Sequence, residues 1–232
     1  MMLDEFQATA GRRAKLIEVR TGTVKPLGNA EVLSAIDKVA RHGPVWLGPT
    51  GFEGDQQSDI ENHGGADKVA LHYAAQHYDE WAREFPERSA ICRPGGFGEN
   101  LVSRGIDETS VCIGDRIRIG AVLVQVSQPR QPCFKLNLRF REPTISQRAE
   151  QSGRTGWFYR VLEPGLVAAG DSIEIVDRPH PAWPVRRVLH FLYDELTDRG
   201  TLAALSDLAA LSASMRALFI RRLQVDAPGE QG

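Results

Sequence analysis

The chain has 232 residues, with 28 lysine and arginine residues against 30 aspartate and glutamate residues, so its formal net charge at pH 7 is −2. A length of this order suits one large domain, or one medium domain with a small appendage. Apolar residues make up 42% and charged residues 25%, which is typical of a soluble protein with a packed core and excludes collagen-like, coiled-coil and disordered chains. The near-neutral balance argues against a dedicated nucleic-acid-binding protein, which usually carries a marked basic excess.

The sequence shows no sign of a membrane or export segment. It has no run of about 18 apolar residues, so no transmembrane helix is expected. Its first six residues are acidic and lack the basic start and apolar run of a signal peptide. The three cysteines, Cys92, Cys112 and Cys133, fit neither a disulfide framework nor a zinc-ribbon spacing. We therefore expect a cytoplasmic protein with free thiols.

The first half of the chain mixes strand and helix patterns. Residues 15–24 are rich in β-branched types and predict a strand, and residues 31–41 predict a short helix. Residues 69–73 predict a second strand, which runs into a helix over 74–85 that ends before a proline. Glycine, proline and asparagine punctuate residues 93–105, which predicts a loop.

The second half begins with the clearest hairpin pattern, over residues 111–126. Ile117 and Ile119 alternate with charged residues, Gly120 and Ala121 form the turn, and three valines alternate back. A further run of strands is predicted at 157–162, 166–167 and 172–176.

The composition changes at residues 178–184, where three prolines make a stiff connector. Beyond it, leucines at helical spacing predict two or three short helices between 185 and 225. So few short helices fold poorly alone, so we expect them to pack against the β domain or against a second subunit in a homodimer. We divide the chain into a β domain over 15–180, a helical module over 185–225, and flexible tails at 1–14 and 226–232.

The strongest chemical signal surrounds Cys133. It follows Arg130, which two prolines flank, and the segment from Ser127 to Arg141 holds four basic residues and no acidic one. A thiol among cations has its thiolate stabilised and its pKa lowered, and the thiolate is the form that attacks as a nucleophile or binds a soft metal. The alternative is a small buried cysteine beside a solvated basic strand. We expect Cys92 and Cys112 to be packing residues.

Three other loops combine glycine with a cation or an amide: the loop from His63 to Lys68, the loop with Gly98 and Asn100, and the turn around Arg154. Tight glycine turns can point several backbone N–H groups at one anion. These loops and an activated thiol suit a phosphorylated ligand held near a sulfur atom. Metal hydrolase chemistry fits less well, because no His-Glu-x-x-His motif and no cysteine pair is present.

Five segments, taken in order, resemble the MOSC domain, which is named for the C-terminus of molybdenum cofactor sulfurases. They are His63-Gly64-Gly65-x-Asp67-Lys68, Phe97-Gly98-Glu99-Asn100-Leu101, Gly114-Asp115, Gln128-Pro129-Arg130-x-Pro132-Cys133-x-Lys135 and Gly153-Arg154-x-Gly156-Trp157. The likeness spans about residues 15–225 and is greatest to bacterial YiiM-type proteins, which carry a three-helix module after the β domain. It implies a mostly β (α+β) fold, with a barrel-like domain, peripheral helices and a small C-terminal helical module.

The resemblance also implies a molybdopterin form of the molybdenum cofactor, with Cys133 as the protein ligand to molybdenum. The implied activity is reduction of N-hydroxylated compounds, such as 6-hydroxylaminopurine, hydroxamic acids and amidoximes, to the amine. His63 is expected either to deliver a proton or to orient the cofactor. The residues expected to bind the cofactor are Lys38, Gly64, Gly65, Lys68, Gly98, Asn100, Ser127, Gln128, Arg130, Lys135 and Arg154.

The source of electrons and one alternative activity complete the hypothesis. The sequence carries no flavin, haem or iron–sulfur signature, so a separate flavin-type reductase is expected to supply the electrons. The competing interpretation is a non-redox protein that carries sulfur as a persulfide on Cys133, or that holds the cofactor for transfer. Both interpretations need a reactive thiolate, so Cys133 alone does not separate them.

Overall fold

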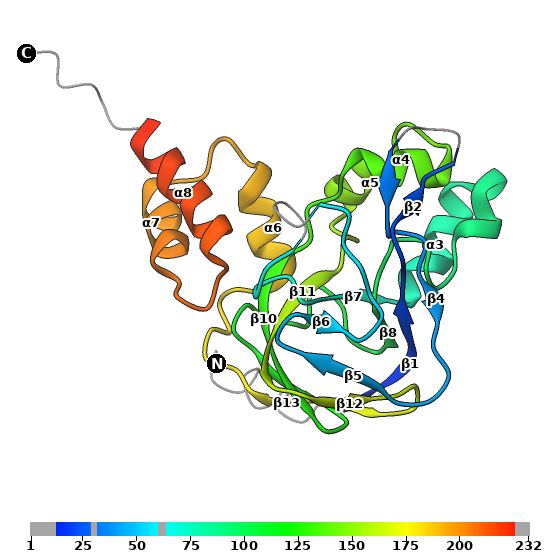
Figure 1. The fold of residues 1–232 in the computed structure, drawn as a ribbon. Coiled ribbons are helices and arrows are strands. Elements are labelled where there is room, and N and C mark those ends of the chain that lie inside the picture. The colour runs from blue at the N-terminus through cyan, green and yellow to red at the C-terminus, as the bar shows by residue number, and fades with distance from the viewer. Residues whose placement is uncertain (1–12, 29–31, 60–63, 226–232) are drawn as a thin grey trace, which may run out of the picture.

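A closed barrel of seven strands forms the body of the protein (Figure 1). The computed structural model describes residues 13–28, 32–59 and 64–225. Around the barrel, β13 is followed by β9, β10, β11, β7, β8 and β1, and pairing of β1 with β13 closes the ring. Every pairing is antiparallel except that of β7 with β8. The barrel strands are β1 (Arg13–Thr21), β7 (Ala70–Ala74), β8 (Leu101–Arg104), β9 (Arg116–Ile119), β10 (Val122–Pro129), β11 (Trp157–Glu163) and β13 (Ser172–Asp177).

Alternating apolar residues fill the barrel interior. Ile117 and Ile119 of β9 face Val122 and Val124 of β10, and all four side chains are fully buried. Gly120 turns the hairpin with a φ of +55°, and an added Cβ there would collide with the Asp171 carboxylate. The predicted hairpin is therefore confirmed, and its turn requires glycine.

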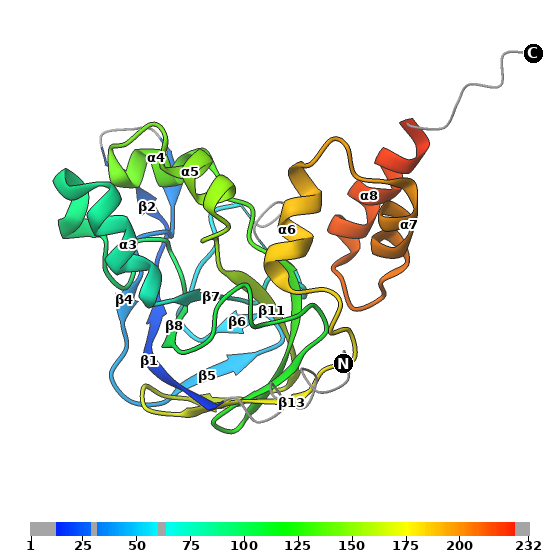
Figure 2. The same cartoon turned by 180° about the vertical axis from the view of Figure 1, so that it is seen from behind.

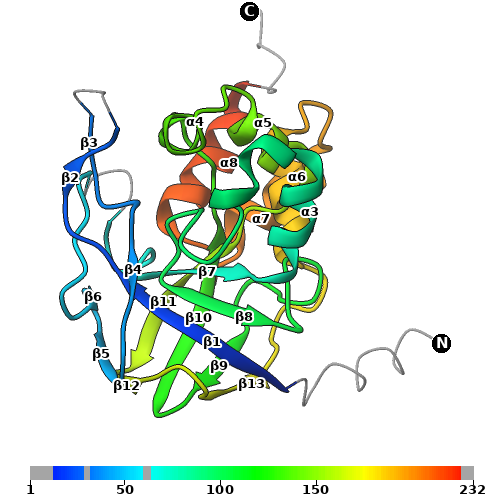
Figure 3. The ribbon, with the colours of Figure 1, turned by 90° about the vertical axis from the view of Figure 1, so that its right-hand side faces the viewer.

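Short strands flank the barrel. A three-stranded sheet is formed by β5 (Val45–Gly48), β6 (Gly51–Phe52) and β12 (Gly165–Val167), and a small ribbon by β2 (Lys25–Pro26) and β3 (Leu33–Ser34). The strand β4 (Val39–Ala40) pairs with the end of β1. Figure 3 shows the ribbon rising beside the helices at one end of the barrel, while β5 and β12 lie toward the other end.

A second core of aromatic side chains lies under the peripheral helices. These helices are α3 (Gln76–Glu84), the 3₁₀ helix η1 (Pro86–Ile91), α4 (Phe134–Phe140) and α5 (Ile145–Ser152). The Tyr73 ring of β7 stacks on Phe97 at 4.5 Å, and the Trp81 indole donates to the Tyr73 hydroxyl at 2.6 Å. Phe140 joins this cluster from α4. The cluster fixes α4 and the loop around Phe97 relative to the barrel.

The C-terminal module consists of α6 (Val185–Tyr193), α7 (Arg199–Asp207) and α8 (Ala213–Val225). Figure 2 shows these three helices grouped together beside the barrel. Val185 and Val188 of α6 are buried in the same core as the barrel strands, and the Ser212 amide donates to the Ser127 carbonyl at 2.9 Å. The mostly β barrel with peripheral helices and a small helical module is therefore confirmed. No helix in the described part of the chain has the length and apolarity needed to cross a lipid bilayer.

Two local predictions are wrong. The helix predicted over 31–41 is absent from the described part of that segment, which instead contains β3 and β4. β3 pairs with β2, and β4 pairs with β1, so hydrogen bonding between strands overrides the local helix propensity. The loop predicted over 93–105 ends early, because Leu101 and Val102 are fully buried where β8 pairs with β1 and β7.

Candidate functional site

A cavity at the α4 end of the barrel brings Cys133 together with several residues expected from the sequence. Its polar wall includes Lys38, Asn100, Arg130, Cys133 and Lys135, and Gly98 also lines it. Leu71, Phe97 and Phe158 supply apolar walls. The cavity volume is about 70 Å³.

Cys133 lies where the chain leaves the barrel and enters a helix. β10 ends at Pro129, and the backbone at Cys133 is extended (φ −129°, ψ 166°) before α4 begins. The Cys133 carbonyl accepts from the Leu136 amide at 3.0 Å. Its side chain is partly exposed, whereas Cys92 and Cys112 are buried. Burial raises the pKa of Cys92, and it raises the pKa of Cys112 to about 11.

Arg130 places a guanidinium in the cavity wall. The residue is 6% exposed, and its backbone amide donates to the Gly156 carbonyl at 3.0 Å. Its Nη1 atom is buried and has no hydrogen-bond partner among the described residues. Burial lowers the pKa of Arg130, and the negative charge of a Cys133 thiolate opposes that shift. A buried cation with an unused donor fits an anionic ligand.

Lys38 lines the cavity from the segment just before β4 and is held by Asp55. Its Nζ donates to the two Asp55 carboxylate oxygens at 2.5 and 2.7 Å, and both side chains are 4% exposed. Asp55 also accepts from the Gly22 amide at 2.7 Å and from Asn100 Nδ2 at 2.8 Å. Burial lowers the pKa of Lys38, whereas its interactions with Asp55 raise it. One carboxylate thus orients both Lys38 and Asn100.

The loop before β8 is organised by the fully buried Glu99. Its carboxylate accepts from the Tyr78 hydroxyl and from the amides of Gly95 and Phe97. Burial raises the pKa of Glu99. Gly98 has a φ of +75°, and an added Cβ would lie 2.6 Å from Ile36 Cγ1. This glycine therefore allows the loop to pack closely against the segment that carries Lys38.

Six of the eleven residues expected to bind the cofactor do not line this cavity. Ser127 Oγ donates to the carbonyl of Asp67 at 2.5 Å and also contacts that of Phe158 at 3.0 Å, so it ties strands and loop together. Gln128 is buried, and its Oε1 has no partner among the described residues. Partial burial lowers the pKa of Lys68. These six residues are Gly64, Gly65, Lys68, Ser127, Gln128 and Arg154. His63 lies outside the described residues.

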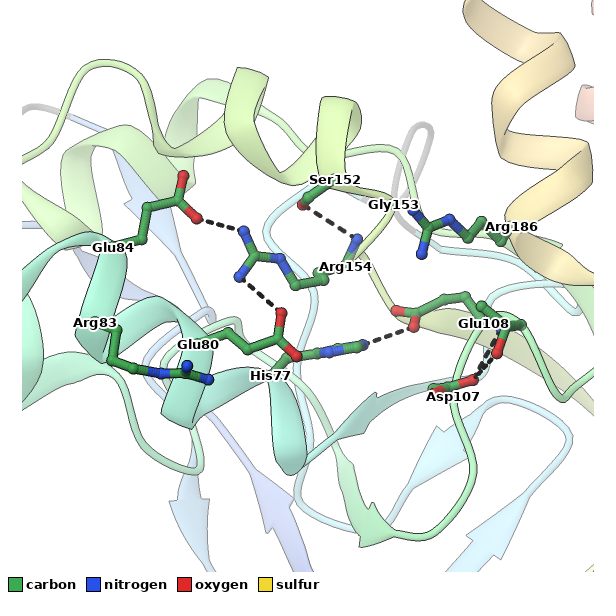
Figure 4. Close-up of a pocket in the computed structure, with 11 residues that line it drawn as sticks. His77, Glu80, Arg83, Glu84, Asp107, Glu108, Ser152, Gly153, Arg154 and Arg186 are labelled. Atoms are coloured by element: carbon green, nitrogen blue, oxygen red, sulfur yellow. Dashed lines mark hydrogen bonds and ion pairs between the residues drawn. The ribbon is translucent and has the colours of Figure 1, made fainter.

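Arg154 is directed into a different hollow, between α3, α5 and the start of α6 (Figure 4). Its guanidinium donates to Glu84 at 2.5 Å and to Glu80 at 3.3 Å, and it lies 3.6 Å from the centre of the Trp81 ring. These contacts neutralise and fix the side chain. The structure therefore does not place Arg154 with Cys133, contrary to the expectation from its glycine-flanked turn.

The sequence reasoning did not find the roles of Asp55 and Glu99. Glu99 stands within one of the five MOSC-like segments, and none of those segments includes Asp55. A buried lysine needs a carboxylate partner. Asp55 is 17 positions from Lys38, and many other carboxylates in the sequence could equally fill that role.

Comparison with known proteins agrees with this architecture. A MOSC domain family model matches residues 59–174, so the barrel with its cysteine-bearing loop belongs to the MOSC domain family. A model of the YiiM-like, 3-alpha helix domain matches residues 183–225, which places the chain among family members with that module.

Individual relatives match most of the chain. Protein YiiM of Escherichia coli (strain K12) is 42% identical over 162 residues, which cover 70% of this chain and 72% of that protein. A crystal structure of YiiM from Escherichia coli superposes with a TM-score of 0.78 at 33% identity, covering 92% of this chain and 94% of the other. A Gibberella moniliformis (strain M3125 / FGSC 7600) protein named Reductase is 42% identical over 176 residues, 75% of this chain, but the match spans only 31% of that longer protein.

Proposed function

We propose that this protein holds a molybdenum cofactor in the Cys133 cavity and reduces N-hydroxylated compounds, such as 6-hydroxylaminopurine, hydroxamic acids and amidoximes. Membership of the MOSC domain family supports cofactor binding, and the relative named Reductase supports an enzyme. The observation that carries the proposal is the buried guanidinium of Arg130, whose Nη1 lacks a partner among the described residues and which lines the same cavity as Cys133.

The residues present fit a phosphorylated, sulfur-coordinated group. Arg130 offers a buried donor to a phosphate oxygen, and Lys135 adds a second cation at the cavity wall. The partly exposed Cys133 offers a soft sulfur ligand. A cavity of about 70 Å³ is much smaller than the roughly 300–1,000 Å³ of typical small-molecule sites. A larger ligand must therefore extend toward the partly exposed Cys133 and Lys135.

The protein's own contribution is placement and solvent control. The molybdenum cofactor, when bound, supplies the two-electron chemistry that removes oxygen from the N–OH group. Cys133 would hold the metal, and Arg130 and Lys135 would bind the phosphate. Leu71, Phe97 and Phe158 exclude water from the apolar side of the cavity. Asp55 keeps Lys38 and Asn100 in fixed positions at the opposite wall.

The first test is metal content. The full chain is produced in a host that makes the cofactor, as wild type, Cys133→Ala and Cys92→Ser, and molybdenum is measured per protein. We expect near-stoichiometric molybdenum in the wild type and in Cys92→Ser, whose substituted thiol lies in the aromatic cluster, and loss in Cys133→Ala. A metal-free wild type that accepts labelled sulfur on Cys133 would instead support the sulfur carrier.

The second test is turnover. Reduction of 6-hydroxylaminopurine is followed with dithionite-reduced methyl viologen as the electron source, so that no partner protein is needed. The wild type is expected to form adenine and Cys133→Ala is not. Molybdenum-loaded wild type that leaves the substrate unchanged would contradict the proposed activity while leaving cofactor binding intact.

A further inference from the structure

The short helix α4 carries apolar residues on two opposite faces. Leu136 and Phe140 are buried in the aromatic cluster, with exposed fractions of 0% and 1%. Phe134 and Leu138 are 57% and 37% exposed. Residues four apart lie on the same face of a helix, so these two side chains form one outward apolar patch. The core of this protein does not use that patch.

The outward patch lies next to the cavity. Phe134 directly follows Cys133, and Lys135, one residue further on, lines the cavity wall. A macromolecule bound on this face of α4 is thereby brought beside the partly exposed Cys133. The patch is thus placed where electrons have to reach the site under the proposed function.

Cations lie beside the patch. The segment from Gln128 to Arg141 contains no acidic residue. Arg141 is exposed at the end of α4, and Arg88 donates to its carbonyl at 3.1 Å. Two carboxylates close to α4 are already engaged: Asp37 with Lys25 at 2.5 Å and with Arg139 of α4 at 3.0 Å, and Glu142, which follows Arg141, with Thr144 at 2.7 Å.

We propose that the outward face of α4 is the docking surface for an acidic, flavin-bearing electron carrier, an inference that rests on the proposed function. An apolar centre with a basic rim is the anatomy of an interface with an acidic partner. In the reaction served, a reduced flavin gives up two electrons, and the N–O bond of the substrate takes them with two protons to yield N–H and water. The exposed Arg141 and the partly buried Lys135 beside the patch favour an acidic carrier over a second copy of this chain, whose own cations would face them.

The test uses matched variants of the cofactor-loaded full chain. Phe134→Ser with Leu138→Ser removes the patch, and Arg141→Asp reverses a rim charge with a residue that tolerates the left-handed backbone there (φ 51°). The control is Trp46→Ser with Leu166→Ser, an exposed cross-strand pair, 46% and 51% exposed, on β5 and β12 away from α4 (Figure 3).

Each protein is assayed for substrate reduction with chemically reduced bacterial flavodoxin, an acidic flavin carrier, and separately with reduced methyl viologen. The α4 variants are expected to lose about tenfold or more in kcat/KM for flavodoxin, because central aromatic contacts dominate interface energies. Their rates with viologen, and both rates of the control, are expected to stay within about twofold of wild type. The flavodoxin rate of the wild type is expected to fall with ionic strength, and less steeply in Arg141→Asp.

Binding of oxidised flavodoxin to the immobilised chain, with or without cofactor, decides the inference independently of turnover. Weaker binding by the α4 variants than by the control supports the docking surface. If the wild type shows no activity with viologen, the proposed function is refuted, but this binding result still stands. Unchanged binding in the α4 variants overturns the inference, as does an equal fall in rate with both donors. A wild-type dimer that the serine variants convert to monomer assigns the patch to a second copy and also overturns it.

Discussion

The buried ion pair between Lys38 and Asp55 leads to the sharpest prediction about stability. Replacing Asp55 by asparagine removes the carboxylate and leaves the Lys38 ammonium at 4% exposure without a counter-charge. Removing one partner of a buried ion pair costs about 3–5 kcal/mol. The amide that replaces the carboxylate can still accept a hydrogen bond, so we expect the low end of this range, a loss of about 3 kcal/mol in the free energy of unfolding.

The reverse substitution is expected to cost less. In Lys38→Met the Asp55 carboxylate keeps two donors, the Gly22 amide at 2.7 Å and Asn100 Nδ2 at 2.8 Å. We therefore predict about 2 kcal/mol for that variant, and less than the sum of the two losses for the double variant Lys38→Met/Asp55→Asn. The double variant removes both charges together. The difference between its loss in unfolding free energy and the sum of the two single losses measures the coupling between Lys38 and Asp55.

The loss in Asp55→Asn is also expected to depend on pH. Burial already lowers the pKa of Lys38 from its ordinary 10.5, and Asp55 opposes that shift. Without Asp55 the folded-state pKa of Lys38 falls further. Between that lowered pKa and 10.5 the unfolded chain therefore binds a proton that the folded chain releases. Stability then rises with pH in that window. The deficit of the variant relative to wild type is predicted to be smaller at about pH 10 than at about pH 7.

Urea unfolding followed by the fluorescence of the buried tryptophans, Trp81 and Trp157, measures these differences. Asp79→Asn is the matched control, because Asp79 pairs with Arg104 at 3.5 Å with side chains 69% and 59% exposed. That exposed pair is expected to contribute less than about 1 kcal/mol. If Asp55→Asn costs no more than Asp79→Asn, or if its deficit does not change with pH, the reasoning about the buried pair is wrong.

Three other outcomes follow from the same geometry. Gly98→Ala is expected to cost about 1–3 kcal/mol, seen as a lower Tm, because the residue has a φ of +75° and its Cβ would crowd the neighbouring segment. Arg130→Met is expected to leave the cofactor-free protein as stable as wild type or more so by thermal unfolding, yet to abolish molybdenum retention, because it removes a buried cation with an unused donor. A thiol reagent at about pH 8 is expected to modify Cys133 in the folded protein and to reach Cys92 and Cys112 only in denaturant, since burial protects both and raises their pKa.

The hairpin at 111–126 could be predicted because its alternation is long, whereas β3 and β4 are only two residues each and pair with segments outside 31–41. The alternation of Ile117 and Ile119 with charges, turned by Gly120, is legible without a structure because both strands of that hairpin lie within one short window. The segment around Lys38 is different. Its strands gain their hydrogen bonds from β1 and β2, and nothing in residues 31–41 themselves indicates those partners.

The candidate site shows the same limit. The chemistry of each loop predicted an anion-binding role, and the structure brings Lys38, Gly98, Asn100, Arg130 and Lys135 to one cavity with Cys133. The turn at Arg154 has a similar composition but a different environment. Its charge is taken up by Glu80 and Glu84 of α3, and only the packing of that helix against the turn reveals this. Composition indicates which residues can bind an anion, whereas tertiary contacts decide which of them are free to do so.

One chain of contacts connects the helical module to the cavity. The Glu108 carbonyl accepts from the Arg186 amide at the start of α6 at 2.8 Å, and its carboxylate accepts from the Gly156 amide at 2.6 Å. The Gly156 carbonyl in turn accepts from the Arg130 amide at 3.0 Å. Gly156 has a φ of +81°, and an added Cβ would collide with the carbonyl of His72, so only glycine fits this link. The start of α6 is therefore linked, through Glu108 and Gly156, to the backbone of the arginine on which the proposed cofactor site depends.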